Sequence, residues 1–546
     1  MVAIARRESS VTGRSTGWFS NRLTIVLGAF VGGMILVQMQ TLFYDESLTI
    51  TAAHPLLYAT PGLRTSALGD QCRYYLAESA IPKSGLGIFT AVGVQPDQVV
   101  SIPDICIYVA DTPVGIQLRT HSYGRTTFFG QFEGSNSRAA CEGLATTMNT
   151  MPDTAINVKL VSPPKATNAG LDRRSSPGAG AITHYYGIQT VSLDTIVAGS
   201  ELTHYYGDWD FVGDPAEYIK PVRPPQWLHE HGWCIDNIDI GPAVDPAMGR
   251  GAFATRPLPK GTMVAPAPMQ VYPRRQDFTA KGDTEALIVN YCLQAAGSDI
   301  LFYPYGPAVN LMNHGSVRSH KANVAIRWAQ DPIAHPQWLD LPLKEFWEMT
   351  YPGGIVLEVV ALRDIRPGEE LFLDYGNGWE EAWNNHVASW KPPTGNALDY
   401  TYTGEMDETA PLRTMKEQQT KPYAKNVGLM CNTPDWDREK SNKITWTEPQ
   451  WSWGMEGYVN CRILERTKGA HGDSVYTVEL MFNRHNLKYD PKIPMKDRYI
   501  DQKVPRRAIR FIDLPYSSDE HLPGVFRHPI AMPDDLFPKQ WKKLSW

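Results

Sequence analysis

The chain has 546 residues, of which 42% are hydrophobic, so it can bury several cores, and its length suggests about three domains. Its 52 basic and 58 acidic side chains give a formal net charge of -6, which provides no broad basic surface and excludes nucleic acid as the expected partner. The seven cysteines stand singly, without the paired spacing that structural zinc needs, so we predict no metal site. In an oxidising compartment they could form disulfides, and their odd number would leave at least one thiol unpaired.

The first predicted element is an apolar segment, residues 23–44, which follows a basic cytosolic tail at residues 1–22. About 20 apolar residues cross a bilayer, and the arginines of the tail favour a cytosolic N-terminus with the rest of the chain translocated. We therefore predict a single-pass transmembrane signal anchor and a membrane location in the secretory pathway (ER or Golgi), with the sidedness open. A cleaved signal or transit sequence and a buried helix remain alternatives, because Gln38 and Gln40 weaken the far end of the segment.

Two stretches, residues 72–211 and 226–390, consist of short strand-like runs broken by Gly and Pro. They resemble each other in three places: 84–100 with 248–264, 148–160 with 312–328, and 182–209 with 355–379. The members of each pair stand about 165 residues apart, with a drift that loop-sized insertions explain, so we predict a tandem duplication. A Pro-rich hinge at 220–225 separates the two copies.

Beyond the second copy, residues 391–425 are polar and are predicted to form a linker. Residues 426–546 contain further strand signals and are predicted to form a small C-terminal β-barrel-like domain. Four aromatic residues near its start could form a cage for a methylated lysine, since aromatic faces attract quaternary ammonium. The plainer interpretation is that they are core and rim aromatics of the barrel. These residues are Trp446, Trp451, Trp453 and Tyr458.

The second copy carries three short motifs in a fixed order: Gly249-Arg250-Gly251, then Asn313-His314, then a segment that ends in Asp374-Tyr375-Gly376. Each motif is a weak signal alone. In this order, and separated by strand-rich intervals, they resemble the SET-domain protein-lysine methyltransferases. The resemblance implies a fold in which the C-terminal segment threads under a loop as a pseudoknot. We therefore expect a mainly β protein with short helices: two tandem SET-like folds, a C-terminal β-barrel-like domain and an N-terminal transmembrane helix.

The resemblance also implies a function, which is S-adenosylmethionine-dependent N-methylation of protein lysines with catalysis in the second copy. It places Tyr375 at the mouth of the lysine channel, where its hydroxyl aligns the amine. The implied cofactor-binding residues are Gly249, Arg250, Gly251, Asn313 and His314, and the expected channel aromatics are Phe302, Tyr303 and Trp379. The chain departs from the family pattern at Gly315-Ser316 and has no cysteine-rich segment after the Tyr motif. We expect these departures to affect the binding of cofactor and substrate but not the role of Tyr375.

The first copy departs further, because Leu86, Thr150 and Tyr205 replace the Arg, His and Asp of the motifs, while Tyr206 keeps the tyrosine position. Threonine lacks the ring and ring nitrogens of histidine, so we expect this copy to be an inactive scaffold. A non-catalytic, protein-binding SET-like module is the alternative for the whole chain. In the leading hypothesis the partner is a protein lysine, and the predicted anchor argues against histones, the substrates that the resemblance would suggest first.

Overall fold

The computed structural model describes residues 71–109, 122–124, 138–161, 171–205, 222–349, 355–432, 458–480, 499–514 and 519–543, apart from short gaps inside these ranges. The predicted membrane segment at 23–44 lies outside these residues, as do Tyr206 and the three tryptophans of the predicted cage; of Tyr458 the structure describes the backbone alone. Within the described ranges, no helix has both the length and the apolar character needed to span a membrane.

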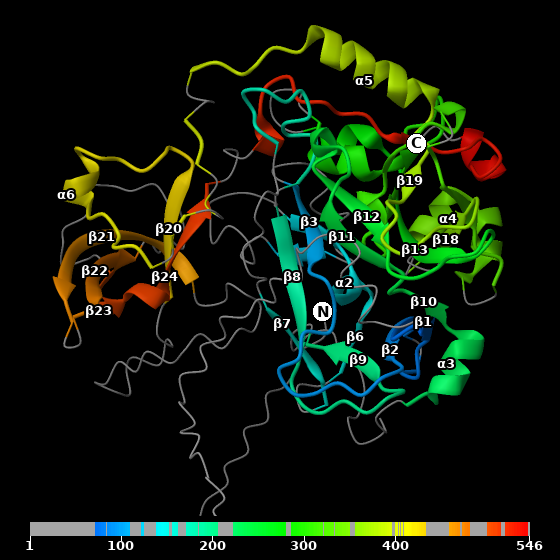
Figure 1. Ribbon diagram of the computed structural model, residues 1–546, viewed down its shortest axis with the longest axis horizontal. Coiled ribbons are helices and arrows are strands. Elements are labelled where there is room, and N and C mark those ends of the chain that lie inside the picture. The colour runs from blue at the N-terminus through cyan, green and yellow to red at the C-terminus, as the bar shows by residue number, and fades with distance from the viewer. Residues whose placement is uncertain are drawn as a thin grey trace, which may run out of the picture. The chain divides into compact units, whose positions relative to one another are not determined.

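The first part of the chain, residues 71–205, is mainly β (Figure 1). Its described strands are β1 (Tyr74–Glu78), β2 (Leu86–Thr90), β3 (Asp104–Val109), β4 (Ser122–Gly124), β5 (Arg138–Glu142), β6 (Asn149–Thr150), β7 (Val158–Val161), β8 (Tyr185–Ser192) and β9 (Glu201–His204), and the short helix α2 (Leu144–Thr147) follows β5. They form two sheets, of order β10-β1-β2-β9-β6 and β4-β5-β3-β8-β7. Strand β10 (Trp233–Cys234) comes from the following part, so the two parts share a sheet.

The second part, residues 222–395, contains β11 (Ile238–Pro242), β12 (Arg250–Ala254), β13 (Met263–Tyr272), β14 (Leu293–Gln294), β15 (Leu301–Pro304), β16 (Asn313–His314), β17 (Val324–Trp328), β18 (Val356–Ala361) and β19 (Phe372–Leu373). Its helices are α3 (Pro225–His231), α4 (Leu343–Glu348) and α5 (Asn377–Ser389), with 3-10 turns that include Leu287–Tyr291 and Val309–Leu311. Strands β11 and β12 form a hairpin, and the others join a sheet of order β16-β19-β17-β18-β13-β15-β14-β25. The last strand, β25 (Ile530–Ala531), comes from the far end of the chain.

Strand β13 lies in the interior of this sheet, paired with β18 on one side and β15 on the other. Nine of its ten residues are buried, and its alternate residues Ala265, Ala267, Met269 and Val271 lie in the main apolar core. Alternation places successive side chains on opposite faces of a strand, so a strand buried throughout must be covered on both faces. The core is therefore continuous around β13.

Strand pairing repeats between the two parts. In the first part, β3 pairs with β5 and β8, and β6 pairs in parallel with β9. In the second part, β13 pairs with β15 and β18, and β16 pairs in parallel with β19. Each part is mainly β with few helices, which is consistent with a SET-like β fold.

The segment that carries Tyr375 is enclosed by strands. The backbone N–H groups of Gly368 and Leu371 donate to Ala254 O and Ala252 O of β12, and β19 lies between β16 and β17, parallel to both. Parallel neighbours cannot be joined by a tight turn, so such pairing brings together segments that are distant in sequence. The Asn313-His314 pair and the Tyr375 motif therefore lie side by side.

A buried carboxylate, Glu370, fixes this segment. Its Oε1 accepts from Asn313 Nδ2 at 2.9 Å, and its Oε2 accepts from Val244 N at 2.8 Å. Asn323 Nδ2 donates to the backbone O of Glu370 at 2.8 Å, while Asn323 Oδ1 accepts from Phe372 N at 2.7 Å. Burying polar groups is costly unless they are hydrogen-bonded, and these four bonds provide that compensation.

The same network occurs in the first part. Glu201 Oε1 accepts from Asn149 Nδ2 at 2.8 Å, and Glu201 Oε2 accepts from Ala80 N at 2.9 Å. Asn157 Nδ2 donates to Glu201 O at 2.7 Å, and Asn157 Oδ1 accepts from Thr203 N at 2.9 Å. The two parts thus resemble each other in individual hydrogen bonds as well as in strand order.

The C-terminal region differs from the predicted boundaries. The sheet β23-β22-β21-β20-β24 comprises β20 (Val427–Asn432), β21 (Tyr458–Lys468), β22 (Ser474–Leu480), β23 (Tyr499–Pro505) and β24 (Ile509–Asp513). The predicted linker 391–425 includes helix α6 (Met415–Gln418) and the fully buried Leu412, which packs in the core of this sheet. Residues 519–543 instead pack on the second part, where Phe537 and Trp541 lie in its core. The expected domain 426–546 is wrong at both ends, because polar composition and strand signals do not reveal such long-range contacts.

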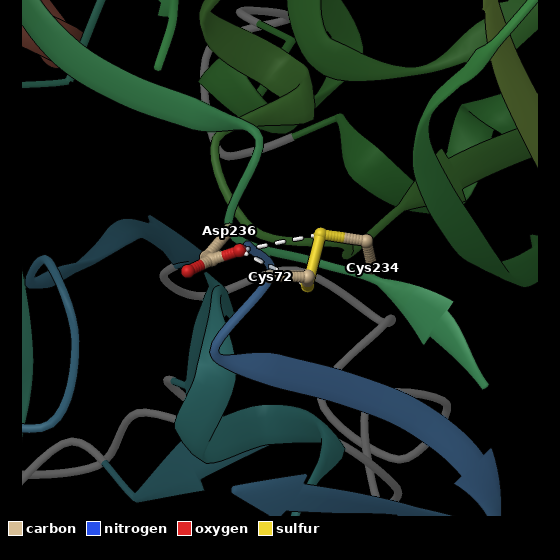
Figure 2. A group of neighbouring side chains, drawn as sticks. All are labelled: Cys72, Cys234 and Asp236. Atoms are coloured by element: carbon tan, nitrogen blue, oxygen red, sulfur yellow. Dashed lines mark hydrogen bonds between the residues drawn. A yellow bond between two sulfur atoms is a disulfide. The ribbon is translucent and has the colours of Figure 1, made fainter. Parts of the chain in front are cut away.

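One disulfide joins the first two parts. Cys72 precedes β1 and Cys234 ends β10, and their sulfurs are bonded to each other (Figure 2). The Asp236 carboxylate lies 3.1 and 3.2 Å from the two sulfurs and forms ion pairs with Arg73 at 3.1 Å and Arg256 at 3.0 Å. Because the sulfurs are bonded, these three residues present no pair of thiolates to a metal ion.

Two further disulfides link Cys106 with Cys141 and Cys431 with Cys461. The first connects β3 to β5, and the second connects β20 to β21. Cys292 is the unpaired cysteine and is fully buried, and burial raises the pKa of its thiol. It is therefore a poor nucleophile in the folded protein.

Removing the link between the parts should destabilise the protein more than removing the link in the C-terminal sheet. The chain-entropy model gives a loss of about 5 kcal/mol for the double variant Cys72→Ala/Cys234→Ala and about 3.6 kcal/mol for Cys431→Ala/Cys461→Ala, because the closed loops span 162 and 30 residues. Urea denaturation without reductant measures both. Peptide mapping that found Cys292 in a disulfide would contradict the pairing.

Candidate active site

His314 and Tyr375 meet where β19 ends. The backbone N–H of Tyr375 donates to His314 Nδ1 at 3.0 Å, so Nδ1 is the acceptor and the imidazole proton resides on Nε2. His314 Nε2 lies 3.0 Å from Glu380 Oε1, and this hydrogen bond holds the pKa of the Glu380 carboxyl below its usual range. The imidazole is thereby fixed in one orientation, with 14% of its side chain exposed.

The Tyr375 hydroxyl points inward. It donates to the backbone O of Met312 at 2.6 Å, and burial raises the pKa of the phenol well above its usual value. The phenol therefore stays protonated at neutral pH. With its hydrogen committed to Met312 O, the oxygen keeps lone pairs that can accept a hydrogen bond from another group.

A small cavity adjoins the Tyr375 ring. Its walls are almost wholly apolar, so a charged group entering it would lose solvation, and a lysine amine there would have a lowered pKa. The lining residues are Ala267, Leu293, Pro304, Val309, Asn310, Met312, Ile326, Leu357, Val359, Leu373, Tyr375 and Ile530.

Aromatic rings cover the other side of Tyr375. The Trp379 ring centroid lies 5.0 Å from that of Tyr375 and 5.0 Å from that of His314. Trp379 is placed by helix α5, which starts directly after Gly376, whose φ of 87° lies in the left-handed region that favours glycine. The Phe526 ring packs edge-on against Trp379 at 5.5 Å. The predicted group of His314, Tyr375 and Trp379 therefore comes together in space.

The two glycines of the first motif are required by packing. A Cβ on Gly251 would lie 2.3 Å from Glu370 Oε1, and a Cβ on Gly249, whose φ is +75°, would lie 2.7 Å from Ile182 Cδ1. The space beside each glycine is therefore filled by other side chains of the chain. That these glycines let the backbone approach a cofactor stays a prediction.

The side chains of Arg250 and Asn313 form hydrogen bonds with other groups of the chain. Arg250 is buried, and its Nη2 donates to the backbone O of Thr183 in the first part. Asn313 Nδ2 donates both to Arg250 O and to Glu370 Oε1. If these two residues contact a cofactor, their backbone groups would therefore make most of that contact.

The expectation that Phe302 and Tyr303 line the channel is wrong. Both side chains are fully buried, and neither lines the cavity beside Tyr375. Phe302 stacks on Trp541 with ring centroids 5.8 Å apart. The physical reason is that β15 is an inner strand, paired with β13 and β14. Both of its faces are covered, so its side chains pack in the core of the protein.

Sequence reasoning missed the carbonyl of Met312, the side chain of Leu373 and the carboxylate of Glu380. Leu373 lies two residues before Tyr375, on the same face of an extended segment, and this spacing was a usable signal. Met312 acts through its backbone, which a side-chain pattern does not reveal. Ile530 belongs to the C-terminal segment, far from Tyr375 in sequence, and no local signal pointed to it.

The first part supports the loop that precedes the Asn-His pair. Glu142, at the end of β5, is buried, and its Oε2 accepts from the backbone N–H of Asn310 at 3.1 Å. Burial raises the pKa of this carboxyl well above its usual range. Because Asn310 lies two residues before Met312, the first part contributes to the position of the carbonyl that holds Tyr375.

The position equivalent to the site in the first part has different chemistry. Thr150 is paired with His204 as His314 is paired with Leu373. Burial lowers the pKa of His204 to about 4, so this imidazole is neutral at physiological pH.

A comparison with protein-family models identifies this region. The model described as SET domain matches residues 249–376, which begin at the Gly-Arg-Gly turn and end directly after Tyr375. Residues 249–376 form a SET domain. The match supports membership of the SET-domain lysine methyltransferase family for this part of the chain. No curated protein matches the chain.

Solved structures also match part of the chain, with low structural similarity. A candidate histone methyltransferase of Plasmodium falciparum matches with 17% identity and a TM-score of 0.18, over 26% of this chain and 96% of that one. The polycomb repressive complex 2 of Chaetomium thermophilum matches with 17% identity and a TM-score of 0.20, over 28% of this chain and 18% of that one. With scores this low, the assignment of the SET domain depends on the family model.

Replacing Gly251 with alanine should destabilise the SET domain. The new Cβ would collide with Glu370 Oε1, and relieving such overpacking costs about 1–3 kcal/mol. Gly378→Ala is the matched control, because nothing lies within 4 Å of its Cβ and alanine favours helix by about 1 kcal/mol. Urea denaturation compares the two, and equal stability of Gly251→Ala and the unsubstituted protein would contradict the described packing of Glu370.

Proposed function

We propose that the SET domain is an S-adenosylmethionine-dependent protein-lysine N-methyltransferase in which Tyr375 aligns the lysine amine. The observation that carries the proposal is Tyr375, which helps to line an apolar cavity and whose hydroxyl is held by Met312 O. An apolar site beside an oriented hydroxyl is the environment that a lysine side chain, with one polar group at its tip, would need.

The chemistry requires a neutral amine. A lysine with a reference pKa of about 10.4 loses its proton at pH 7 at a cost of about 4.6 kcal/mol. The apolar walls reduce this cost because desolvation lowers the pKa of the ammonium group. The lone pairs of the Tyr375 oxygen can then accept an N–H of the amine and direct its own lone pair along the reaction axis. A strong base is therefore unnecessary in this site.

The residues beside Tyr375 fit the proposed cofactor. The partly exposed rings of His314 and Trp379 offer aromatic faces to a purine, and the Glu380 carboxylate offers an anion to a cationic sulfur. When bound, S-adenosylmethionine supplies the methyl group: the N–C bond forms as the C–S bond breaks, the electron pair stays on sulfur, and the amine later loses a proton to solvent. His314 holds the Tyr375 backbone throughout, since Nδ1 is its acceptor.

We further propose that residues 72–211 are a degenerate SET-like copy that acts as a scaffold for a SET domain at 226–390. The matching networks of Glu201 and Glu370 support this view, as does the contact between Glu142 and Asn310. Thr150 in place of a histidine removes the ring that the second copy places against Trp379.

The proposed location is the membrane of the secretory pathway, with the apolar segment 23–44 as anchor and a protein as substrate. Three disulfides support exposure to an oxidising compartment, because cytosolic proteins seldom keep structural disulfides. A lumenal site would require imported cofactor, since S-adenosylmethionine is made in the cytosol.

Lumenal exposure predicts protease protection. In sealed microsomes that contain the full chain with a C-terminal tag, the tag should survive added protease and be lost once detergent is present. A tag that is digested without detergent would place the SET domain on the cytosolic side of the membrane and contradict lumenal exposure.

A second function, a non-catalytic protein-binding module, is favoured by one observation. Ile530 of the C-terminal segment lines the cavity beside Tyr375 and is 6% exposed, so the chain itself supplies part of the wall of the proposed substrate site. Isothermal calorimetry with S-adenosylmethionine separates the two functions, because a module without methylation has no need to bind the cofactor.

Tyr375→Phe removes the hydroxyl and keeps the ring. We expect methylation of protein lysines to fall about 100-fold or more, because a misaligned amine costs at least that factor. Binding of S-adenosylmethionine should change little, since the backbone N–H of residue 375 still reaches His314. Tritium transfer from labelled cofactor measures the rate, and unchanged turnover in this variant would refute the role of Tyr375.

A further inference from the structure

In the first part, the turn that leads into Met148 is held by a carboxylate of the same part. Asp104, the first residue of β3, accepts from Leu144 N at 3.1 Å and from Ala145 N at 3.2 Å. These two residues begin helix α2, which ends directly before Met148. The first backbone N–H groups of a helical turn have no partner inside the turn, so the buried Asp104 supplies the acceptors that they need.

In the second part, the corresponding place in β13 holds a proline. The separation in sequence that relates Met148 to Met312 also relates Asp104 to Pro268, and β13 pairs with β15 as β3 pairs with β5. Proline has neither a carboxylate nor a backbone N–H. The 3-10 turn Val309–Leu311 precedes Met312, and the N–H at its middle residue therefore needs an acceptor from another element.

The first part supplies that acceptor. Glu142 Oε2 accepts from Asn310 N at 3.1 Å, and Gly143 N donates to Tyr305 O at 3.3 Å. Two successive residues of the first part thereby hold the loop 305–312 at two points. Because Glu142 is 1% exposed, water does not compete for its hydrogen bond, which is stronger in this buried position than it would be at the surface.

The loop needs this support because its backbone is strained. Ala308 has a φ of +58°, a left-handed conformation that residues other than glycine adopt at an energetic cost. Such a conformation persists only where the surrounding contacts enforce it.

The same loop carries two groups of the candidate active site. Met312 O accepts from the Tyr375 hydroxyl at 2.6 Å, and the Asn310 side chain lines the cavity beside Tyr375. A shift of the loop would therefore move both the acceptor that orients Tyr375 and one wall of the cavity.

We propose that Glu142 is a positioning residue of the SET domain, which the first part supplies where Pro268 provides no acceptor. By holding Asn310 N, Glu142 fixes the Met312 carbonyl and, through it, the Tyr375 hydroxyl. The inference rests on the proposed methyltransferase function and adds a residue outside the SET domain on which that function depends.

The role of Glu142 requires a hydrogen-bond acceptor rather than a charge. Burial, and to a smaller degree the Asp104 carboxyl, raise the pKa of Glu142 well above its usual range, although the Asn310 N–H and the Arg250 guanidinium act in the opposite direction. This shift favours the neutral acid. A glutamine amide has nearly the same shape and an oxygen that can accept from Asn310 N, whereas leucine has no acceptor.

The first measurement does not depend on methylation. In the full chain carrying Glu142→Leu, amide hydrogen exchange of residues 305–312 should be about fivefold faster than in the unsubstituted chain, since one net hydrogen bond contributes a factor of this order. Glu142→Gln should leave the exchange unchanged. Mass spectrometry of the peptides that contain this loop measures both variants.

The second measurement is tritium transfer from labelled S-adenosylmethionine to a pool of synthetic peptides, each with one lysine. Glu142→Leu should lower the rate at saturating peptide about 10-fold or more, because a misplaced reacting group costs at least this factor. The KM for peptide should change little, and Glu142→Gln should keep the full rate.

Asn157→Ala is the matched control for a general loss of stability. It removes hydrogen bonds to Glu201 O and Thr203 N inside the first part and leaves Glu142 in place. Urea denaturation should show a loss of stability at least as large as in Glu142→Leu, while the rate at saturating peptide is retained.

The inference is overturned if the folded Glu142→Leu variant keeps either the exchange or the rate of the unsubstituted chain. A loss of rate that Asn157→Ala shares, or that Glu142→Gln does not restore, would also overturn it. If Glu142→Leu does not fold, Glu142→Met replaces it, because the flexible methionine side chain adapts to irregular packing. If the unsubstituted chain neither binds S-adenosylmethionine in calorimetry nor modifies the peptides, the proposed function fails, and the exchange measurement still decides whether Glu142 holds the loop.

Discussion

A carboxylate buried away from water needs hydrogen-bond donors on every side, and Glu370 obtains them from three separate segments. Its side chain accepts from Val244 N and Asn313 Nδ2, and Asn323 holds its backbone. Since removing one partner leaves a buried charge unsatisfied, which costs several kcal/mol, the segments cannot separate cheaply. This constraint fixes β19 between β16 and β17, and so determines where Tyr375, His314 and Met312 meet.

The first part contains the same kind of hydrogen-bonded buried carboxylate. Glu201 is held by Asn149 and Asn157 as Glu370 is held by its asparagines, so the backbone arrangement that positions Tyr375 in the second part is also present in the first, where Thr150 stands in place of the histidine. The hydrogen-bond network of the first part therefore does not depend on the imidazole. In this chain the folded first part holds the Glu142 carboxylate at the backbone N–H of Asn310. The first part therefore helps to stabilise the SET domain.

The sequence was sufficient to predict the SET domain, because Asn313-His314 and Tyr375 belong to short contiguous motifs whose order is typical of it. It failed at Phe302 and Tyr303, where an aromatic strand looks the same whether it lines a channel or fills a core. It also failed at residues 519–543. Strand β25 has two residues and no periodicity, and the segment contacts Asn290 across a separation of 236 residues, so no local pattern could indicate its partner. Composition and motif spacing therefore do not reveal which short strands pair across long separations in sequence.

The position of Phe537 and Trp541 in the core of the SET domain has a consequence for biosynthesis. The ribosome adds about 5–20 residues per second, so Trp541 emerges on the order of ten seconds after Tyr375. During that interval the cavity beside Tyr375 lacks both its strand from the C-terminal segment and the aromatic side chains that complete the core. A nascent chain therefore exposes this apolar site before the C-terminal segment can cover it.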